Sequence, residues 1–153
     1  MPGKLPPGGA GCGAGASMAC LDTSVLLDLL GRGGRGPRTR AASFLRELVA
    51  RGEPLTTTRL NVAELYVGVE RSRSPAREEE AVLAVLSGLQ ILEFEERSAR
   101  AFAKLTAYLQ TRGRPAGDMD VLIASVALVS GESLITRDVR HFAALPGLTV
   151  PQY

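Results

Sequence analysis

The apolar positions along this chain fall into two alternating patterns. Short apolar runs predict strands at residues 18–22, 54–56, 89–94, 133–136 and 147–150. Between these runs, apolar residues recur every three or four positions, as they do on one face of a helix. This spacing predicts one helix that ends at residue 71 and others at 24–30, 38–51, 75–87, 96–112 and 118–130. Strands that alternate with helices are typical of an α/β protein whose parallel sheet is covered on both faces.

Residues that favour helix ends support these boundaries. The side-chain oxygen of Thr57 or Thr58 can cap the helix that ends at Arg71, and Pro75 suits the first turn of the next helix. Gly131 is the residue type that ends helices, and Asp118 is the natural N-cap of the helix that Gly131 closes. The order of the strands in the sheet cannot be derived from these patterns.

Composition predicts one folded domain over residues 18–153. The chain has 153 residues, of which 45% are hydrophobic, and this is enough for one core. Residues 1–17 are rich in Gly, Pro and Ala, which predicts a flexible tail. The net charge of +2 implies no strong electrostatic field. The longest apolar stretch, 121–129, is too short for a bilayer, which takes about 20 residues to cross.

The two cysteines provide neither a disulfide framework nor a metal-binding spacing. Cys12 lies in the predicted tail, and Cys20 lies in the first apolar run, where we expect a buried thiol. This cysteine usage agrees with a reducing compartment. We therefore expect a cytoplasmic protein.

Four carboxylates occupy positions where acids are unusual. Asp22 and Asp138 follow the carboxyl ends of two predicted strands, and ligands bind at those ends in open parallel sheets. Glu64 lies in a helix that is apolar nearly all round, although ionised glutamate is seldom buried without a partner. Asp120 opens a second helix of this kind. These four acids are the candidate site residues.

Each acid also has an ordinary structural explanation. Asp22 could cap the helix that follows it, Asp138 could be a turn residue, and Asp120 could interact with the helix dipole. Glu64 could pair with either of two arginines near the ends of its own helix, Arg59 or Arg71. The four positions together are harder to explain in this way than any one of them.

A cluster of acids has a chemical use. Like charges raise one another's pKa, so carboxylates persist together where a cation neutralises them. Mg²⁺ and Mn²⁺ prefer oxygen ligands, and such an ion can polarise a phosphodiester and activate water. No Cys/His pattern offers a competing zinc site. We expect His141, the only histidine, to pack or to face solvent rather than to catalyse.

Three segments carry these acids in an order that resembles a known family. They are CLDTSVLLDLL, TTTRLNVAELYVGVERS and GDMDVLIASVALVSGESLITRDVRHFAALPGLTV. In order and spacing they resemble the PIN-domain ribonucleases over about residues 18–150, most of all the VapC toxins of toxin–antitoxin operons. The resemblance implies a three-layer α/β/α sandwich with a central, mostly parallel sheet. It also implies an endoribonuclease that depends on Mg²⁺ or Mn²⁺ and cleaves single-stranded regions of RNA.

The resemblance assigns a role to each acid. Asp22 and Asp120 match the principal metal ligands, and Glu64 and Asp138 match the other two catalytic acids. Many relatives have Asn in place of Asp138. Thr136 matches the hydroxyl residue that accompanies this fourth position.

The resemblance also implies partners. We expect a homodimer, and a VapB-like antitoxin that places a basic residue among the acids in place of the metal. RNA is the expected substrate, and its phosphates need basic contacts. The candidates are Arg32, Arg35, Arg38, Arg40, Arg112 and Arg114, although we expect most of these arginines to belong to the solvated surface.

Two other classes of protein remain open at this point. A non-catalytic PIN-like domain would bind RNA or protein, and an assay for metal-dependent cleavage would separate it from the nuclease. A phosphoryl-transfer domain could use Asp22 as a phosphate acceptor. However, the DTS segment lacks the second aspartate of a DxD motif, and Lys104 lies within a helix rather than after a late strand.

Overall fold

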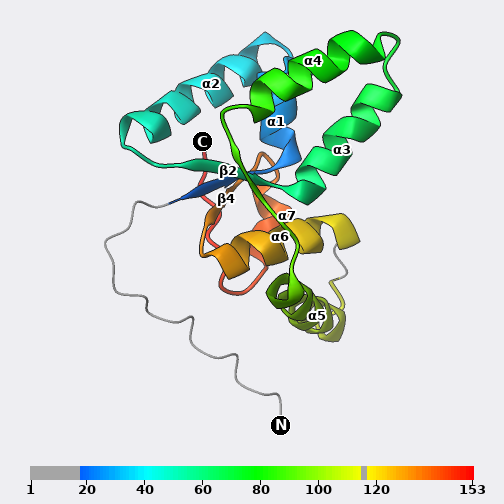
Figure 1. The fold of residues 1–153 in the computed structure, drawn as a ribbon. Helices are drawn as coiled ribbons and strands as arrows, with labels where there is room; N and C mark the ends of the chain where they lie inside the picture. Colours follow the sequence, from blue (N-terminus) through cyan, green and yellow to red (C-terminus); the bar gives the residue numbers. More distant parts are fainter. Residues whose placement is uncertain (1–17, 115–116) are drawn as a thin grey trace.

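The computed structural model describes residues 18–114 and 117–153, so the predicted tail at 1–17 lies outside the described residues. Strands and helices alternate along the chain (Figure 1). In chain order they are β1 (Ala19–Leu21), α1 (Thr23–Leu29), α2 (Arg35–Ala50), β2 (Leu55–Thr58), α3 (Arg59–Glu70), α4 (Pro75–Leu86), β3 (Gln90–Leu92), α5 (Glu96–Thr111), α6 (Asp118–Ser130), β4 (Ser133–Ile135) and α7 (Val139–Ala143). The predicted α/β class is confirmed.

The strands of the described residues form one parallel sheet with the order β3-β2-β1-β4. The first strand therefore lies inside the sheet, where Cys20 is opposite Thr56 of β2 and Leu134 of β4. Carboxyl ends of parallel strands meet at one edge. Asp22, which follows β1, consequently lies between the ends of two other strands.

The side chains of β1 divide the core between the two faces of the sheet. Ala19 and Leu21 pack with residues of α1 to α4, whereas Cys20 packs with residues of α5, α6 and α7. This division follows from the alternation of side chains along a strand. Figure 1 shows α1 to α4 on one side of the sheet and α5 to α7 on the other. The predicted three-layer sandwich is confirmed.

Several helix ends are as predicted. The hydroxyl of Thr58 accepts a hydrogen bond from the backbone N–H of Asn61, and the Asn61 side chain in turn accepts one from the N–H of Thr58. This capping box resolves the choice between Thr57 and Thr58. Pro75 is the first residue of α4, and Gly131 ends α6 in the left-handed conformation (φ +70°) that glycine adopts without strain. Cys20 is buried, as predicted, and burial raises the pKa of its thiol well above the usual range.

One helix start and one N-cap differ from the predictions. The second helix begins at Arg35 rather than at residue 38, because Pro37 fits within its first turn. Gly117, not Asp118, occupies the N-cap position of α6, and Asp118 is the first helical residue. Because Asp118 already lies within the first turn, its predicted role as the N-cap is wrong, and its contribution is limited to the helix dipole.

The end of the chain also differs from the prediction. No strand forms at 147–150 among the described residues, where a single backbone hydrogen bond joins the N–H of Leu134 to the oxygen of Thr149 (2.9 Å). Pro146 and Pro151 flank this short segment and Gly147 begins it, and these residues interrupt regular strand pairing. The short helix α7 was not predicted, because five residues show too little periodicity. No helix in the described ranges combines the length and the apolar character needed to cross a membrane.

Candidate active site

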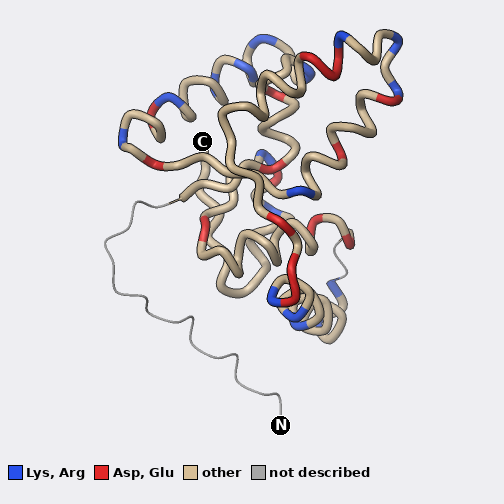
Figure 2. The backbone as a smooth tube through the Cα atoms, in the orientation of Figure 1, with Lys and Arg blue, Asp and Glu red and all other residues tan. Residues whose placement is uncertain are grey.

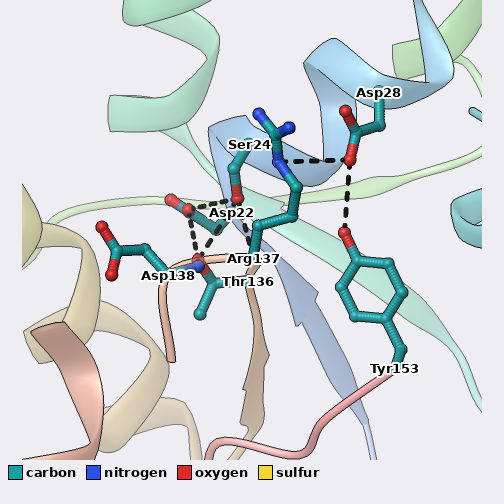
Figure 3. A network of polar contacts seen from close by, with 7 residues as sticks. All are labelled: Asp22, Ser24, Asp28, Thr136, Arg137, Asp138 and Tyr153. Carbon is teal, nitrogen blue, oxygen red and sulfur yellow. Dashed lines mark hydrogen bonds and ion pairs between the residues drawn. The ribbon is translucent and has the colours of Figure 1, made fainter. Parts of the chain in front are cut away.

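Asp22 lies at the carboxyl end of β1 and is the most buried of the four candidate acids, with 7% of its surface exposed. Its Oδ2 accepts hydrogen bonds from the hydroxyls of Ser24 (2.9 Å) and Thr136 (2.8 Å). Its Oδ1 accepts a weaker bond from the Asn61 amide (3.3 Å). Figure 3 shows the Asp22 carboxylate beside the Ser24 and Thr136 hydroxyls. These donors hold the carboxylate in one orientation.

Asp22 does occupy the N-cap position of the next helix, as its ordinary structural explanation requires, but its side chain does not act as a cap. Asp22 is the N-cap residue of α1, and its backbone oxygen accepts the N–H of Leu26 (3.2 Å). Its side chain makes no capping hydrogen bond. The backbone alone thus begins the helix, and the carboxylate faces the hydroxyl groups at the edge of the sheet.

Glu64 reaches the same region from α3. Its carboxylate accepts a hydrogen bond from the Thr23 hydroxyl, which in turn accepts one from the Asn61 amide (2.9 Å). Arg59 pairs instead with Glu93 (2.6 Å), and Arg71 forms no ion pair with Glu64 in the described part of the chain. Partial burial raises the pKa of Glu64, and the negative charges of Asp22 and Asp120 raise it further. The hydrogen bond from Thr23 lowers this pKa and so opposes the rise.

Asp120 lies in the first turn of α6. Burial is the main cause that raises the pKa of this carboxyl, and the charge of Asp22 adds to it. Asp138 also raises the pKa, while His141 opposes the rise. Asp120 is thus linked electrostatically to each of the other three acids, because Asp22 and Asp138 act on it and its own charge acts on Glu64.

Asp138 and His141 lie at the outer side of this region. The Nδ1 of His141 is 3.0 Å from Oδ2 of Asp138 and 3.6 Å from Oδ2 of Asp120. His141 faces solvent, as predicted, with 64% of its side chain exposed. The backbone N–H of Asp138 donates to the Thr136 hydroxyl (3.1 Å), which links this acid to the donor that holds Asp22.

The donor set suits a hard divalent cation. In the described part of the chain, no Lys or Arg forms an ion pair with any of the four acids, and His141 is the basic side chain at ion-pair distance from Asp120 and Asp138. Within the same ranges, no three acidic, His or Cys side chains are close enough to surround one ion. Mg²⁺ is commonly held by one or two carboxylates and keeps several waters. Asp22 and Asp120 could provide these one or two carboxylates.

Sequence reasoning missed three polar residues of this site. Ser24 and Asn61 hold the Asp22 carboxylate, and His141 contacts two of the acids. The spacing of Thr58 and Asn61 is a capping-box signal, but it does not reveal that the Asn61 amide points toward Asp22. Only the packing of α3 beside α1 brings these groups together.

The six candidate arginines have different surroundings. Arg32 pairs with Glu78, and the guanidinium of Arg112 lies 3.6 Å from the centre of the Tyr108 ring. Arg35 and Arg38 line a cavity on α2 of about 450 Å³. Arg40 lines a second cavity, of about 470 Å³, that includes Thr136 and Asp138. Two of the six therefore share a cavity with candidate site residues: Arg40 with Thr136 and Asp138, and Arg32 with Glu64, in a cavity of about 460 Å³.

Comparison with known families identifies the class of protein to which this fold and this site belong. The PIN domain family matches residues 19–148. The chain belongs to the PIN-domain family. Among its curated relatives is Ribonuclease VapC19 of Mycobacterium tuberculosis, which is 34% identical over 134 residues, covering 88% of this chain and 99% of the relative. Ribonuclease VapC2 of Rickettsia felis is 27% identical over 107 residues, covering 70% of this chain and 80% of the relative.

Solved structures show the same fold. VapBC2 from Rickettsia felis, bound to a DNA fragment from its promoter, matches with a TM-score of 0.78 and 23% identity, over 89% of this chain and 98% of that chain. FitAcB from Neisseria gonorrhoeae matches with a TM-score of 0.72 and 26% identity, over 88% of this chain and 97% of that chain. The resemblance seen in the three sequence segments is thus confirmed at the level of the family.

Proposed function

We propose that this protein is a VapC-type toxin, a metal-dependent endoribonuclease that cleaves single-stranded regions of RNA. The observation that carries the proposal is the group of electrostatically coupled acids at the carboxyl edge of the sheet, without an arginine or lysine to neutralise them. The VapC ribonucleases among its relatives support the same chemistry.

The metal would be held chiefly by Asp22 and Asp120. When bound, Mg²⁺ or Mn²⁺ supplies positive charge that stabilises the charge on a reacting phosphodiester and activates water. The hydroxyls of Ser24 and Thr136 keep the Asp22 carboxylate oriented toward the ion. Burial disfavours the charged form of both Glu64 and Asp120, and a nearby cation would reverse that preference.

The remaining acids would act on water and on the edge of the site. Glu64 is half-buried and held by Thr23, so its free oxygen can accept a hydrogen bond from the attacking water and orient it. Asp138 is exposed and next to His141, so it would contribute negative charge at the rim. The phosphate-acceptor alternative for Asp22 is disfavoured, because residue 24, where a DxD motif has its second aspartate, is Ser24, and Lys104 lies within α5 rather than after a strand.

The test uses the purified full chain and a labelled single-stranded RNA. We expect cleavage with Mg²⁺ or Mn²⁺ and none with EDTA. The Asp120→Asn variant should lose both cleavage and the rise in melting temperature that Mg²⁺ produces in the wild type, because a ligand of the native state stabilises it. Cleavage that persists in EDTA would contradict the metal dependence. A metal response without cleavage of any RNA would favour the non-catalytic alternative.

We further propose that a VapB-like antitoxin neutralises the enzyme in the cytoplasm. A cavity of about 460 Å³ between α1, α3 and α4 is lined by apolar side chains such as Leu27, Leu65 and Val82, and Glu64 lies at its wall. An apolar segment of the antitoxin could fill this cavity and place an arginine beside Glu64. Co-expression with the neighbouring antitoxin gene should relieve growth arrest. Arrest that continues while the antitoxin is present would contradict the pairing.

The homodimer is a separate proposal that rests on the family resemblance. One chain has a mass of 16.1 kDa, and sedimentation of the purified protein should give twice that mass. A concentration-independent monomer would contradict it.

A further inference from the structure

Next to the candidate acids lies a second polar feature, the cavity of about 470 Å³ to which Arg40 belongs. We call it the arginine cavity. It is lined by Asp28, Arg40, Thr136, Arg137, Asp138, Val139, Arg140, Gln152 and Tyr153. Its volume is within the range of small-ligand sites. Thr136 belongs both to this cavity and to the hydrogen bonds around Asp22, so the cavity and the candidate active site are contiguous.

The charges around the arginine cavity are unequal. Each of its two acids already has a partner: Asp28 pairs with Arg137 (3.3 Å), and Asp138 contacts His141 (3.0 Å). Arg40 and Arg140 have no carboxylate within ion-pair distance in residues 18–114 and 117–153. The cavity therefore presents two positive charges that the described protein does not neutralise, and Figure 2 shows basic residues recurring along α2, which carries Arg40.

The wall between these arginines is held in place from within the protein. The Asp28 side chain is 1% exposed. Its Oδ2 forms an ion pair with Nε of Arg137 (3.3 Å) and accepts a hydrogen bond from the Tyr153 hydroxyl (3.5 Å), as Figure 3 shows. The Tyr153 ring stacks on Phe44, with 5.2 Å between ring centres. Burial raises the pKa of Tyr153 to about 12, and the charges of Arg137 and Arg40 partly oppose this rise. Arg40 lines the same cavity as Tyr153 and Arg137.

Gly33, which lies between α1 and α2, packs closely against Asp28 and Arg137 of this wall. A Cβ atom at Gly33 would lie 2.3 Å from Oδ1 of Asp28 and 3.4 Å from Nη1 of Arg137. That Oδ1 atom has no hydrogen-bond partner in the described structure, so Asp28 depends on its contact with Arg137 for compensation. A fixed wall with two free guanidinium groups beside it is suited to bind an anion at a defined place.

We propose that the arginine cavity binds a backbone phosphate of the RNA, next to the phosphodiester that the candidate acids would cleave. This inference rests on the proposed function for its substrate class. RNA is favoured over other anions because the cavity continues into the acids through Thr136 and Asp138. A strand held there by one phosphate would be positioned with a neighbouring phosphate at Asp22 and Asp120.

The test measures binding without cleavage. A fluorescein-labelled single-stranded RNA of fifteen uridines is titrated with the full chain in EDTA, at several salt concentrations. The variant is Arg40→Ala combined with Arg140→Ala. The matched control is Arg77→Ala combined with Arg97→Ala, which removes the same charge from exposed positions on α4 and α5 outside the cavity.

We expect the Arg40/Arg140 double variant to bind the RNA about tenfold more weakly than the wild type, because two charge-assisted contacts are lost. The slope of log affinity against log salt should fall by about 0.7, since one phosphate contact on a single strand contributes about 0.7. The control should lose less than about threefold, as expected for a general charge effect. Melting temperatures check that all variants fold.

The results separate this inference from the proposed function. Equal losses in the two double variants, or an absence of RNA binding by the wild type, would overturn the phosphate site. A double variant that binds RNA normally but no longer binds a co-expressed antitoxin would overturn it in favour of a protein partner. Arginine-dependent RNA binding by a wild type that cleaves no RNA with Mg²⁺ would support the phosphate site and contradict the nuclease.

Discussion

Two buried acids at opposite ends of the sheet have similar local contacts and different surroundings. Asp22 follows the carboxyl end of β1 and accepts hydrogen bonds from Ser24 and Thr136. Glu132 precedes the amino end of β4, is 5% exposed, and accepts a hydrogen bond from the Thr56 hydroxyl. Each is a buried acid held by threonine.

The difference lies in the other charges nearby. The charge of Asp22 acts on Glu64 and Asp120, whereas the causes that shift the pKa of Glu132 are its own burial and the Thr56 hydrogen bond. Burial of an acid therefore does not by itself identify a site. Convergence of several acids at the carboxyl edge of the sheet does, because that convergence is costly unless a cation compensates it.

The largest expected effect is a loss of RNA cleavage at Asp22 that does not occur at Glu132. Asp22→Asn keeps the size of the side chain but removes the negative charge, so we expect RNA cleavage with Mg²⁺ to fall more than about 100-fold. Glu132→Gln is the matched change at the other end of the sheet and should stay within about twofold of the wild-type rate. Comparable losses in both variants would show that the contrast between the two acids is wrong.

The next effect sharpens the role of the hydroxyl groups. Thr136→Val removes the hydrogen bond to Asp22 and should lower the cleavage rate about 10- to 100-fold, since the carboxylate loses part of its orientation. Thr57→Val is the control, because its hydroxyl donates to the backbone oxygen of Leu21 (2.7 Å) and not to an acid. Both changes should cost about 1 kcal/mol of stability, measured by denaturant unfolding. If the two variants lose activity equally, orientation of Asp22 is not the cause.

A smaller effect concerns the pH dependence of stability. Burial raises the pKa of Glu132 above its ordinary value of 4.5, so the folded state binds this proton more tightly than the unfolded chain does. The free energy of unfolding should therefore fall as pH rises through the raised pKa. Glu132→Gln should remove this component, and its melting temperature should exceed that of the wild type more at pH 7 than at pH 4. Parallel melting curves of the two proteins across that range would contradict the assignment.

The smallest effect separates the two acids in the first turn of α6. Asp118→Ala should cost only about 0.3–1 kcal/mol through the helix dipole, because Gly117 holds the capping position, and should leave most activity intact. Asp120→Asn should raise the melting temperature of the metal-free protein, since it relieves repulsion with Asp22, and should abolish activity. If Asp118→Ala loses the melting response to Mg²⁺ and Asp120→Asn keeps it, the assignment of the metal ligand is wrong by two residues.

The sequence by itself determined the fold class, most of the helices and the family. Local physics is sufficient for these features: apolar periodicity predicts helices, and Pro75 and Gly131 act on the backbone next to them. The segments where local signals were weakest were predicted wrongly, as at 147–150 and at α7. The four acids could also be singled out as a group, because an acid in an apolar segment is visible without a structure.

Only the tertiary structure decided how those acids are held and what lies beside them. The Asn61 amide contacts Asp22 across 39 positions of sequence, and the Thr136 hydroxyl contacts it across 114. Such contacts depend on strand order and helix packing, which no local pattern encodes. The same is true of the arginine cavity, where Arg40 of α2 and Arg140 of α7, far apart in the sequence, line one cavity. A residue's type is local information, but its partner is set by the fold.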